Sequence, residues 1–299
     1  MRASLLLSCL FLACSAVWAA DPMLIVTGNT IVHDLTLRIG GDRISASCLL
    51  QPGMDPHMYQ PVPEDVKKLA AAKLVIINGL GFEGWFEGLA KEAKFAGPVI
   101  VATAGIATVP SLCRAHGHDH HHHHDVPDPH PWNSIRQGVR YAENIRDALA
   151  AADPAGAEAI RARAAAVIDE LRRTDAWATA ELAAIPKGQR KIVTNHDALA
   201  YFAKDYGFEV LSPNTALEDS QPSAKQVADM VACIRTQGVK GVFFAYGKNP
   251  KLIEQIAAEA GVRVGPGLYL DGVGPLDGPA GTYVGMFRHN VQAIVATLR

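Results

Sequence analysis

The segment from Asp153 to Pro186 reads DPAGAEAIRARAAAVIDELRRTDAWATAELAAIP and predicts one long helix in the middle of the chain. Asp153 is suited to cap the helix, and Pro154 stands at the first helical position, where proline is tolerated. Apolar residues then recur at close to the helical period, at Ile160, Ala164, Val167, Ile168, Leu171, Ala178 and Leu182. A helix of roughly 30 residues rises about 45 Å, enough to run the length of the molecule. We therefore expect a rigid connecting helix over residues 153–185, with a lobe on each side.

Short apolar runs alternate with helical patterns on both sides of this helix. The strands expected are Met23–Thr27, Arg43–Leu50, Leu74–Ile77, Val99–Ala102, Lys191–Thr194, Glu209–Leu211, Val242–Ala245 and Val262–Val264. The other helices expected are Glu64–Ala72, Gly84–Lys91, Ala198–Tyr206, Ser223–Thr236, Pro250–Ala260 and Gly281–Leu298. Strands that alternate with helices of this length imply βαβ units and mainly parallel sheets. The predicted fold is α/β, with an N-terminal lobe over residues 20–152 and a C-terminal lobe over residues 186–299.

The first residues have the pattern of a secretory signal peptide. Arg2 gives a positive start, Leu5–Trp18 is mostly apolar, and small residues allow cleavage after Ala19. The apolar stretch is too short to span a membrane. A lipid attached at Cys14 is the competing interpretation, although the residues before Cys14 fit the lipoprotein pattern poorly. We therefore expect residues 1–19 to be removed and the mature protein to be exported.

The composition agrees with an exported globular protein and excludes several other classes. The chain has 299 residues, of which 49% are hydrophobic and 19% are charged, and its net charge is −2. This charge argues against nucleic-acid binding, which needs a basic face. Only Cys48, Cys113 and Cys233 lie beyond the signal peptide, so at most one disulfide can form within a chain. No CxxC pair occurs, which excludes a cysteine zinc knuckle.

Seven histidines lie within the nine residues from His116 to His124, which read HGHDHHHHH. A histidine-rich tract is typical of metal binding, because imidazole is the commonest metal ligand in proteins. The run is internal and interrupted, which argues against an expression tag; a solvated low-complexity loop is the remaining alternative. Ligands on a loop without a core lose entropy when they close on a metal. We therefore expect an accessory metal-collecting loop made by His116, His118, His120, His121, His122, His123 and His124.

Four residues outside the run are candidates for a second, tighter metal site. His57, His196 and Asp271 follow predicted strands, and His130 follows the histidine run. In open α/β sheets ligands bind beyond the carboxyl ends of the strands, so two facing lobes would bring these loops to one cleft. Three imidazoles and one carboxylate form a tetrahedral zinc set. Asp277 is an alternative to Asp271.

Several blocks of the chain resemble a known family. They are Gly53–Pro61 (GMDPHMYQP), Asn78–Trp85 (NGLGFEGW), Asp128–Trp132 (DPHPW), Asn195–Ala203 (NHDALAYFA) and Gln221–Ala224 (QPSA). Together they resemble the metal-binding proteins that serve bacterial ABC importers, and the internal histidine run points to the zinc branch of that family. The resemblance covers essentially the whole mature chain. Two departures are Asn133-Ser134, in place of Leu-Asp, and Ala245-Tyr246-Gly247, in place of a Glu-Pro pair.

The resemblance implies a fold of two α/β lobes joined by a rigid helix, with the metal held between them by His57, His130, His196 and Asp271. It implies high-affinity binding of Zn²⁺ in the periplasm and delivery to an inner-membrane ABC permease with its ATPase. A periplasmic zinc metallochaperone would be a further partner, and we expect a monomer that is not an enzyme. Manganese-type relatives carry a carboxylate at the position of His196, and zinc accepts imidazole more readily than manganese does.

Other functions stay open at this point. A surface adhesin or a zinc buffer is one alternative, and a manganese importer component is another, whereas a zinc hydrolase would need an open coordination position. Asp55, Glu83 and Asp197 are candidates to orient the ligand imidazoles, since such a carboxylate often accepts the second ring N–H. Each of the three could equally be a turn residue or a helix cap.

Overall fold

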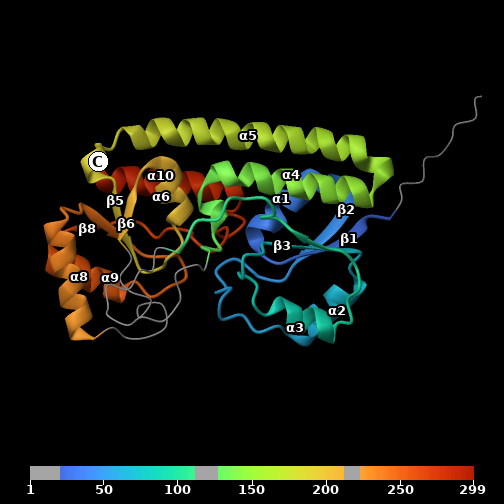
Figure 1. Cartoon of the computed structure of the whole chain (residues 1–299), viewed down its shortest axis with the longest axis horizontal. Helices are drawn as coiled ribbons and strands as arrows, with labels where there is room; N and C mark the ends of the chain where they lie inside the picture. Colours follow the sequence, from blue (N-terminus) through green and yellow to red (C-terminus); the bar gives the residue numbers. More distant parts are fainter. Residues whose placement is uncertain (1–20, 112–126, 212–222) are drawn as a thin grey trace, which may run out of the picture.

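The computed structural model describes residues 21–111, 127–211 and 223–299 (Figure 1). The expected signal peptide and the histidine run at 116–124 lie outside these residues, as does Cys113. Cys48 and Cys233 are free thiols. Among the described residues, no helix has both the length and the apolar character that crossing a membrane requires.

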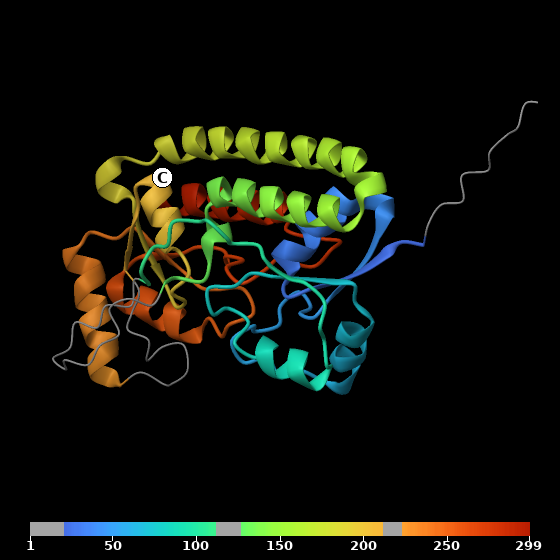
Figure 2. The same cartoon turned by 45° about the vertical axis from the view of Figure 1, so that its right-hand side comes forward.

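The N-terminal lobe is built on a parallel sheet with the strand order β2-β1-β3-β4. Its strands are β1 (Met23–Thr27), β2 (Ile44–Cys48), β3 (Leu74–Ile77) and β4 (Val99–Val101). The crossovers carry α1 (Thr30–Gly40), α2 (Pro63–Ala71) and α3 (Phe86–Glu92). In both views α2 and α3 lie on one side of this sheet, and α1 lies on the other (Figures 1 and 2). The sheet is thus covered on both faces, as parallel sheets require.

The C-terminal lobe repeats this architecture. Its sheet has the order β6-β5-β7-β8, and all its strands are parallel. The strands are β5 (Lys191–Thr194), β6 (Glu209–Leu211), β7 (Gly241–Phe243) and β8 (Arg263–Val264). Its helices are α6 (Ala200–Tyr206), α8 (Ala224–Thr236) and α9 (Lys251–Ala260). The predicted fold class of two mainly parallel α/β lobes with a long connecting helix is therefore confirmed, while the exact lobe boundaries stay a prediction.

A layer of three helices covers both lobes: α4 (Ile135–Ala152), α5 (Ala157–Ala183) and α10 (Tyr283–Leu298). The long helix α5 has 27 residues and runs above both sheets, with α4 and α10 beneath it (Figures 1 and 2). One hydrophobic cluster includes residues of both sheets and all three helices, for example Ile25, Leu171, Ile192 and Phe287. The two lobes therefore share a core and are not merely linked by α5.

Polar contacts fix the start of the long helix to the N-terminal lobe. Arg43 donates two hydrogen bonds to the carboxylate of Asp153, both 2.7 Å long. The same carboxylate accepts the backbone N–H of Gly156 at 3.1 Å, in the 3₁₀ turn Pro154–Gly156 that precedes α5. Asp153 was expected as a cap, and it caps this 3₁₀ turn. It also positions α5 over the end of α1.

Two helices were not anticipated from the sequence. Helix α1 begins after Asn29, whose side chain accepts the backbone N–H groups of Ile31 and Val32 at 3.0 Å. Helix α4 contains Gly138, where a Cβ atom would lie 2.6 Å from the ring of Tyr283 in α10. Glycine lowers helix propensity by about 1 kcal/mol, and here it allows α10 to approach α4 closely. The expected strand Arg43–Leu50 is also shorter, since only Ile44–Cys48 pairs with β1.

We expect Leu171→Ala to destabilise the protein. Leu171 is 0% exposed in the core that joins α5 to both lobes, so its truncation leaves a cavity. This cavity should lower the free energy of unfolding by about 2–5 kcal/mol. Arg173→Ala on the exposed side of α5 is the control, with an expected change within about 0.5 kcal/mol. Urea unfolding followed by circular dichroism measures both. Equal effects of the two substitutions would contradict the buried position of Leu171.

Candidate metal centre

Three imidazoles and one carboxylate from opposite lobes meet in the structure. His57, His130, His196 and Asp271 each offer one ligand atom, and these four atoms lie within 4.8 Å of one another. The Nε2 atoms of His57 and His130 are 3.3 Å apart, and Nε2 of His130 lies 3.6 Å from Oδ1 of Asp271. Tetrahedral ligands at zinc-like bond lengths stand about 3.3 Å apart. The spacing is therefore compatible with one divalent metal ion.

The loops beyond the strands supply these side chains. His57 follows β2 and His196 directly follows β5, whereas Asp271 lies beyond β8. His130 precedes the 3₁₀ turn Pro131–Asn133 that leads into α4. His130 and His196 are each only 2% exposed, whereas His57 is exposed and Asp271 is partly buried. The cluster is thus closed on the side of the helical layer and open on the side of His57.

The carboxylate that orients a candidate ligand is Asp128, which was not singled out from the sequence. Its Oδ1 lies 2.7 Å from Nδ1 of His130 and accepts the backbone N–H of the same residue at 2.8 Å. Because a carboxylate only accepts, Nδ1 of His130 carries the proton and Nε2 is left for a metal. Oδ2 of Asp128 accepts the backbone N–H of Ala200 at 3.1 Å, from the opposite lobe. The sequence feature that could have indicated this role is an aspartate two residues before His130.

The residues that were expected to orient imidazoles make other contacts. Asp55 accepts the backbone N–H of His57 at 3.0 Å and pairs with Lys248. Glu83 accepts the backbone N–H groups of Asn78 at 2.8 Å and Gly79 at 3.1 Å, so it holds the turn after β3. Asp197 accepts a hydrogen bond from Ser111. Asp277, the alternative to Asp271, is exposed and is not among the clustered residues.

The charges in the cluster suit metal binding at neutral pH. Burial alone would raise the pKa of Asp271, but the adjacent His196, at 2.5 Å from Oδ1, outweighs burial and holds that pKa well below its usual range. The packed neighbours of its ring desolvate the His57 imidazole and lower its pKa, although the residue as a whole is exposed, and the neighbouring His130 lowers that pKa further. Asp271 is therefore ionised and His57 neutral near pH 7, which are the states that a metal requires of its ligands.

Aromatic rings and an amide form the inner wall of the site. The His130 ring lies with its centroid 5.7 Å from that of Phe82 and 5.2 Å from that of Trp132. The indole N–H of Trp132 and the side-chain amide of Asn133 each donate to the carbonyl oxygen of Leu270 at 2.9 Å. Asn133, one of the departures from the family pattern, thus holds the residue before Asp271 in place.

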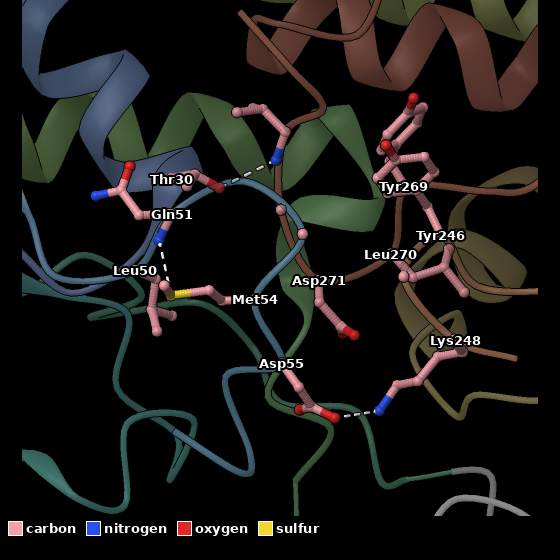
Figure 3. Close-up of a pocket in the computed structure, with 14 residues that line it drawn as sticks. Thr30, Leu50, Gln51, Met54, Asp55, Tyr246, Lys248, Tyr269, Leu270 and Asp271 are labelled. Carbon is pink, nitrogen blue, oxygen red and sulfur yellow. Dashed lines mark hydrogen bonds and ion pairs between the residues drawn. The ribbon is translucent and has the colours of Figure 1, made fainter. Parts of the chain in front are cut away.

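A pocket opens beside Asp271, which is one of the residues that line it (Figure 3). The N-terminal lobe contributes Thr30, Met54 and Asp55, and the C-terminal lobe contributes Tyr246 and Lys248. The Asp271 carboxylate points toward the side of the pocket where Asp55 and Lys248 meet. Tyr246 belongs to the second departure from the family pattern, and its ring packs on Tyr269 at a centroid distance of 4.3 Å.

We expect Glu83→Gln to change how stability depends on pH. Burial raises the pKa of Glu83 from 4.5 to about 6, although the surrounding N–H donors lower it. The folded state therefore binds this proton more tightly than the unfolded chain, so the contribution to stability is full below pH 4.5 and is lost as the pH rises through about 6. Relative to the glutamine variant, the wild type should lose about 2 kcal/mol between pH 4.5 and pH 7.

Urea unfolding at the two pH values measures this difference. Glu87→Gln, at an exposed position of α3, is the control and should track the wild type at both. A difference between wild type and Glu83→Gln that stays constant with pH would show that Glu83 does not titrate in this range.

Comparison with known proteins places the chain among metal-uptake proteins. The family described as "Zinc-uptake complex component A periplasmic" (ZnuA) matches residues 25–297. The chain is 33% identical to the iron-binding protein YfeA of Yersinia pestis over 270 residues, which cover 90% of this chain and 84% of YfeA. It is also 33% identical to the manganese-binding lipoprotein MntA of Bacillus subtilis over 294 residues, 95% of this chain and 93% of MntA.

A solved structure of a related protein has the same fold as this chain. The periplasmic zinc-binding protein TroA of Treponema pallidum superposes with a TM-score of 0.82 at 26% identity, over 93% of this chain and 99% of TroA. These relatives are solute-binding proteins rather than enzymes. The chain belongs to the ZnuA family, the periplasmic metal-binding components of ABC metal-uptake systems.

Proposed function

We propose that this protein binds one Zn²⁺ ion through His57, His130, His196 and Asp271 and delivers it to an ABC permease for uptake. The observation that carries the proposal is the convergence of three imidazoles and one ionised carboxylate, with ligand atoms within 4.8 Å, at the boundary between two lobes. The family match supports an uptake role, and the permease with its ATPase would be the partner.

The donor set favours zinc over manganese as the cargo. Manganese is a hard ion that prefers oxygen, and three of the four donors here are imidazole nitrogens. Zinc takes four nitrogen and oxygen ligands in a tetrahedron, which matches both the number and the spacing of these atoms. Relatives named for iron, manganese and zinc all align with this chain, so manganese uptake is the second candidate.

A zinc hydrolase fits the site poorly. Such an enzyme keeps one coordination position open for water, whereas four protein groups converge here. Transport protein, surface adhesin and zinc buffer would share the same site, and the family match favours transport. We further propose that the protein reaches the periplasm after cleavage of residues 1–19, works as a monomer, and receives zinc directly or from a metallochaperone. Mass spectrometry of the mature N-terminus would distinguish cleavage after Ala19 from lipid attachment at Cys14.

Calorimetric titration of the metal-free protein tests the metal and its ligands. The wild type should bind one zinc ion per chain and bind it more tightly than manganese. His196→Ala should lose most of this affinity, because it removes a ligand. Asp128→Asn should weaken binding about 10–100-fold, since it weakens the hydrogen bond that orients His130.

His289→Ala is the matched control, because His289 lies outside the cluster and contacts the carbonyl oxygen of Gly267 at 3.2 Å. It should bind zinc as the wild type does. Zinc binding by His196→Ala at wild-type affinity would refute the ligand assignment. Tighter binding of manganese than of zinc would replace zinc with the second candidate and leave the site itself intact.

We propose a separate role for His116–His124 as an accessory metal collector. Its seven imidazoles are tethered to the same chain as the cleft, which raises the local concentration of metal beside the tight site. Deleting residues 116–124 should remove additional weaker zinc binding and slow the acquisition of zinc from a competing donor, while one tight site remains. The same titration measures both classes of site. Loss of all tight binding on deletion would mean that the run supplies a principal ligand.

A further inference from the structure

Loops from opposite lobes come into direct contact at the mouth of the pocket beside Asp271. The loop after β2 carries Gly53 and Asp55, and the turn after β7 carries Gly247 and Lys248. Gly247 has a φ of +87°, and a Cβ atom on it would lie 3.3 Å from the carbonyl oxygen of Gly53. The two backbones thus approach each other closely at this point.

An ion pair crosses the mouth at the same place. Lys248 donates from Nζ to Oδ2 of Asp55, and the two side chains are only 22% and 30% exposed (Figure 3). The other oxygen of Asp55 accepts the backbone N–H of His57 at 3.0 Å. A single carboxylate therefore connects Lys248 of the C-terminal lobe with the backbone of His57 in the N-terminal lobe.

An aspartate and a lysine at ordinary pKa values are both ionised at neutral pH. The two side chains are partly buried, so solvent screens this pair less than a pair on the open surface.

The two ends of this link differ in how they are supported. The turn that carries Lys248 is held by hydrogen bonds from Lys248 N–H to the carbonyl oxygen of Ala245 (3.0 Å) and from Tyr246 N–H to that of Leu268 (2.7 Å). His57 lies on an irregular loop and is the exposed member of the cluster, whereas His130 and His196 are buried. His57 is therefore the candidate ligand whose position depends most on such a link.

We propose that Asp55 and Lys248 form an interlobe latch that holds His57 on the metal and slows release of the metal from the cleft. Asp55 acts as a positioning residue, with Lys248 as its anchor on the opposite lobe. The inference rests on the proposed function, because it takes His57 as a ligand of the transported ion. Breaking the pair removes the contact of this loop with the C-terminal lobe, while Trp85 still holds the carbonyl oxygen of Pro56 at 3.1 Å. His57 can then leave the metal more readily, while the other three residues stay fixed.

Zinc release to excess chelator, followed by stopped flow on the zinc-loaded full-length protein, tests the latch. Lys248→Met and Asp55→Asn should each release zinc about fivefold faster, the effect expected of one partly exposed ion pair. The amide oxygen introduced by Asp55→Asn can still accept the His57 N–H, so this variant isolates the ion pair from the backbone contact. The double variant should be no faster than either single variant, and Lys248→Arg should stay close to the wild type. Release from the wild type should quicken with salt, and release from Lys248→Met should not.

Lys251→Met is the matched control, because it removes the same charge from an exposed position three residues further along. Wild-type release from Lys248→Met, or an equal increase in Lys251→Met, would overturn the latch while leaving the proposed zinc site standing. A wild-type protein that fails to hold zinc would overturn the proposed function together with the latch. Thermal unfolding of the metal-free variants should show no loss beyond that of one partly exposed ion pair, which separates the latch from a general loss of stability.

Discussion

The hydrophobic core shared by the two lobes is the constraint on which the rest of the structure depends. Ile25 in the first sheet, Leu171 in α5 and Ile192 in the second sheet belong to one buried cluster. A change in the spacing of the lobes would open this cluster to water, at a cost proportional to the apolar area exposed. The spacing matters because the candidate ligands come from both lobes, and a metal tolerates errors of only a few tenths of an ångström.

Several hydrogen bonds connect the two lobes at the site itself. The fixed spacing of the lobes therefore also fixes the positions of the site residues. Asp128 binds the imidazole of His130 and the backbone of Ala200, which begins α6 in the other lobe. Asn133 donates to the carbonyl oxygens of both Ala198 and Leu270, at 2.9 Å each. These bonds lie in buried surroundings, where an unpaired polar group is costly. The inner half of the site is therefore held in place by contacts within the protein itself.

The sequence was sufficient to predict the strands of both sheets, most of the helices and the loops of the site, because these follow from local patterns. The apolar period of α5 and the short strands predicted two parallel sheets, and the polar residues after those strands predicted which loops would meet. Helix α4 was missed because Gly138 weakens its local helix signal, and the reason for this glycine is Tyr283, which is far away in the chain. Helix α1 was missed because its residues 30–40 are largely apolar and half of them would suit a strand.

The contacts that orient the site could not be predicted for a different reason. The role of Asp128 depends on the position of Ala200, and the role of Asp55 depends on Lys248 across the cleft. Glu83 was a candidate either to orient an imidazole or to hold a turn, and it holds the turn after β3, since three N–H groups converge on its carboxylate. The pairings of Asp128 and Asp55 depend on how the two lobes face each other, which no local pattern in the sequence specifies.

A rigid frame also limits how a metal can leave. In a protein whose lobes share a core, wide opening of the cleft is expensive, so release must begin with a smaller movement. The burial of the four residues indicates where that movement starts: His130 and His196 are enclosed, Asp271 is bound to His196, and His57 is exposed on an irregular loop. With these four residues as the proposed ligands, displacement of the His57 imidazole would lower the coordination number without disturbing the core. The asymmetry between one exposed residue and three supported ones would thus let a rigid protein combine firm binding with release of the metal.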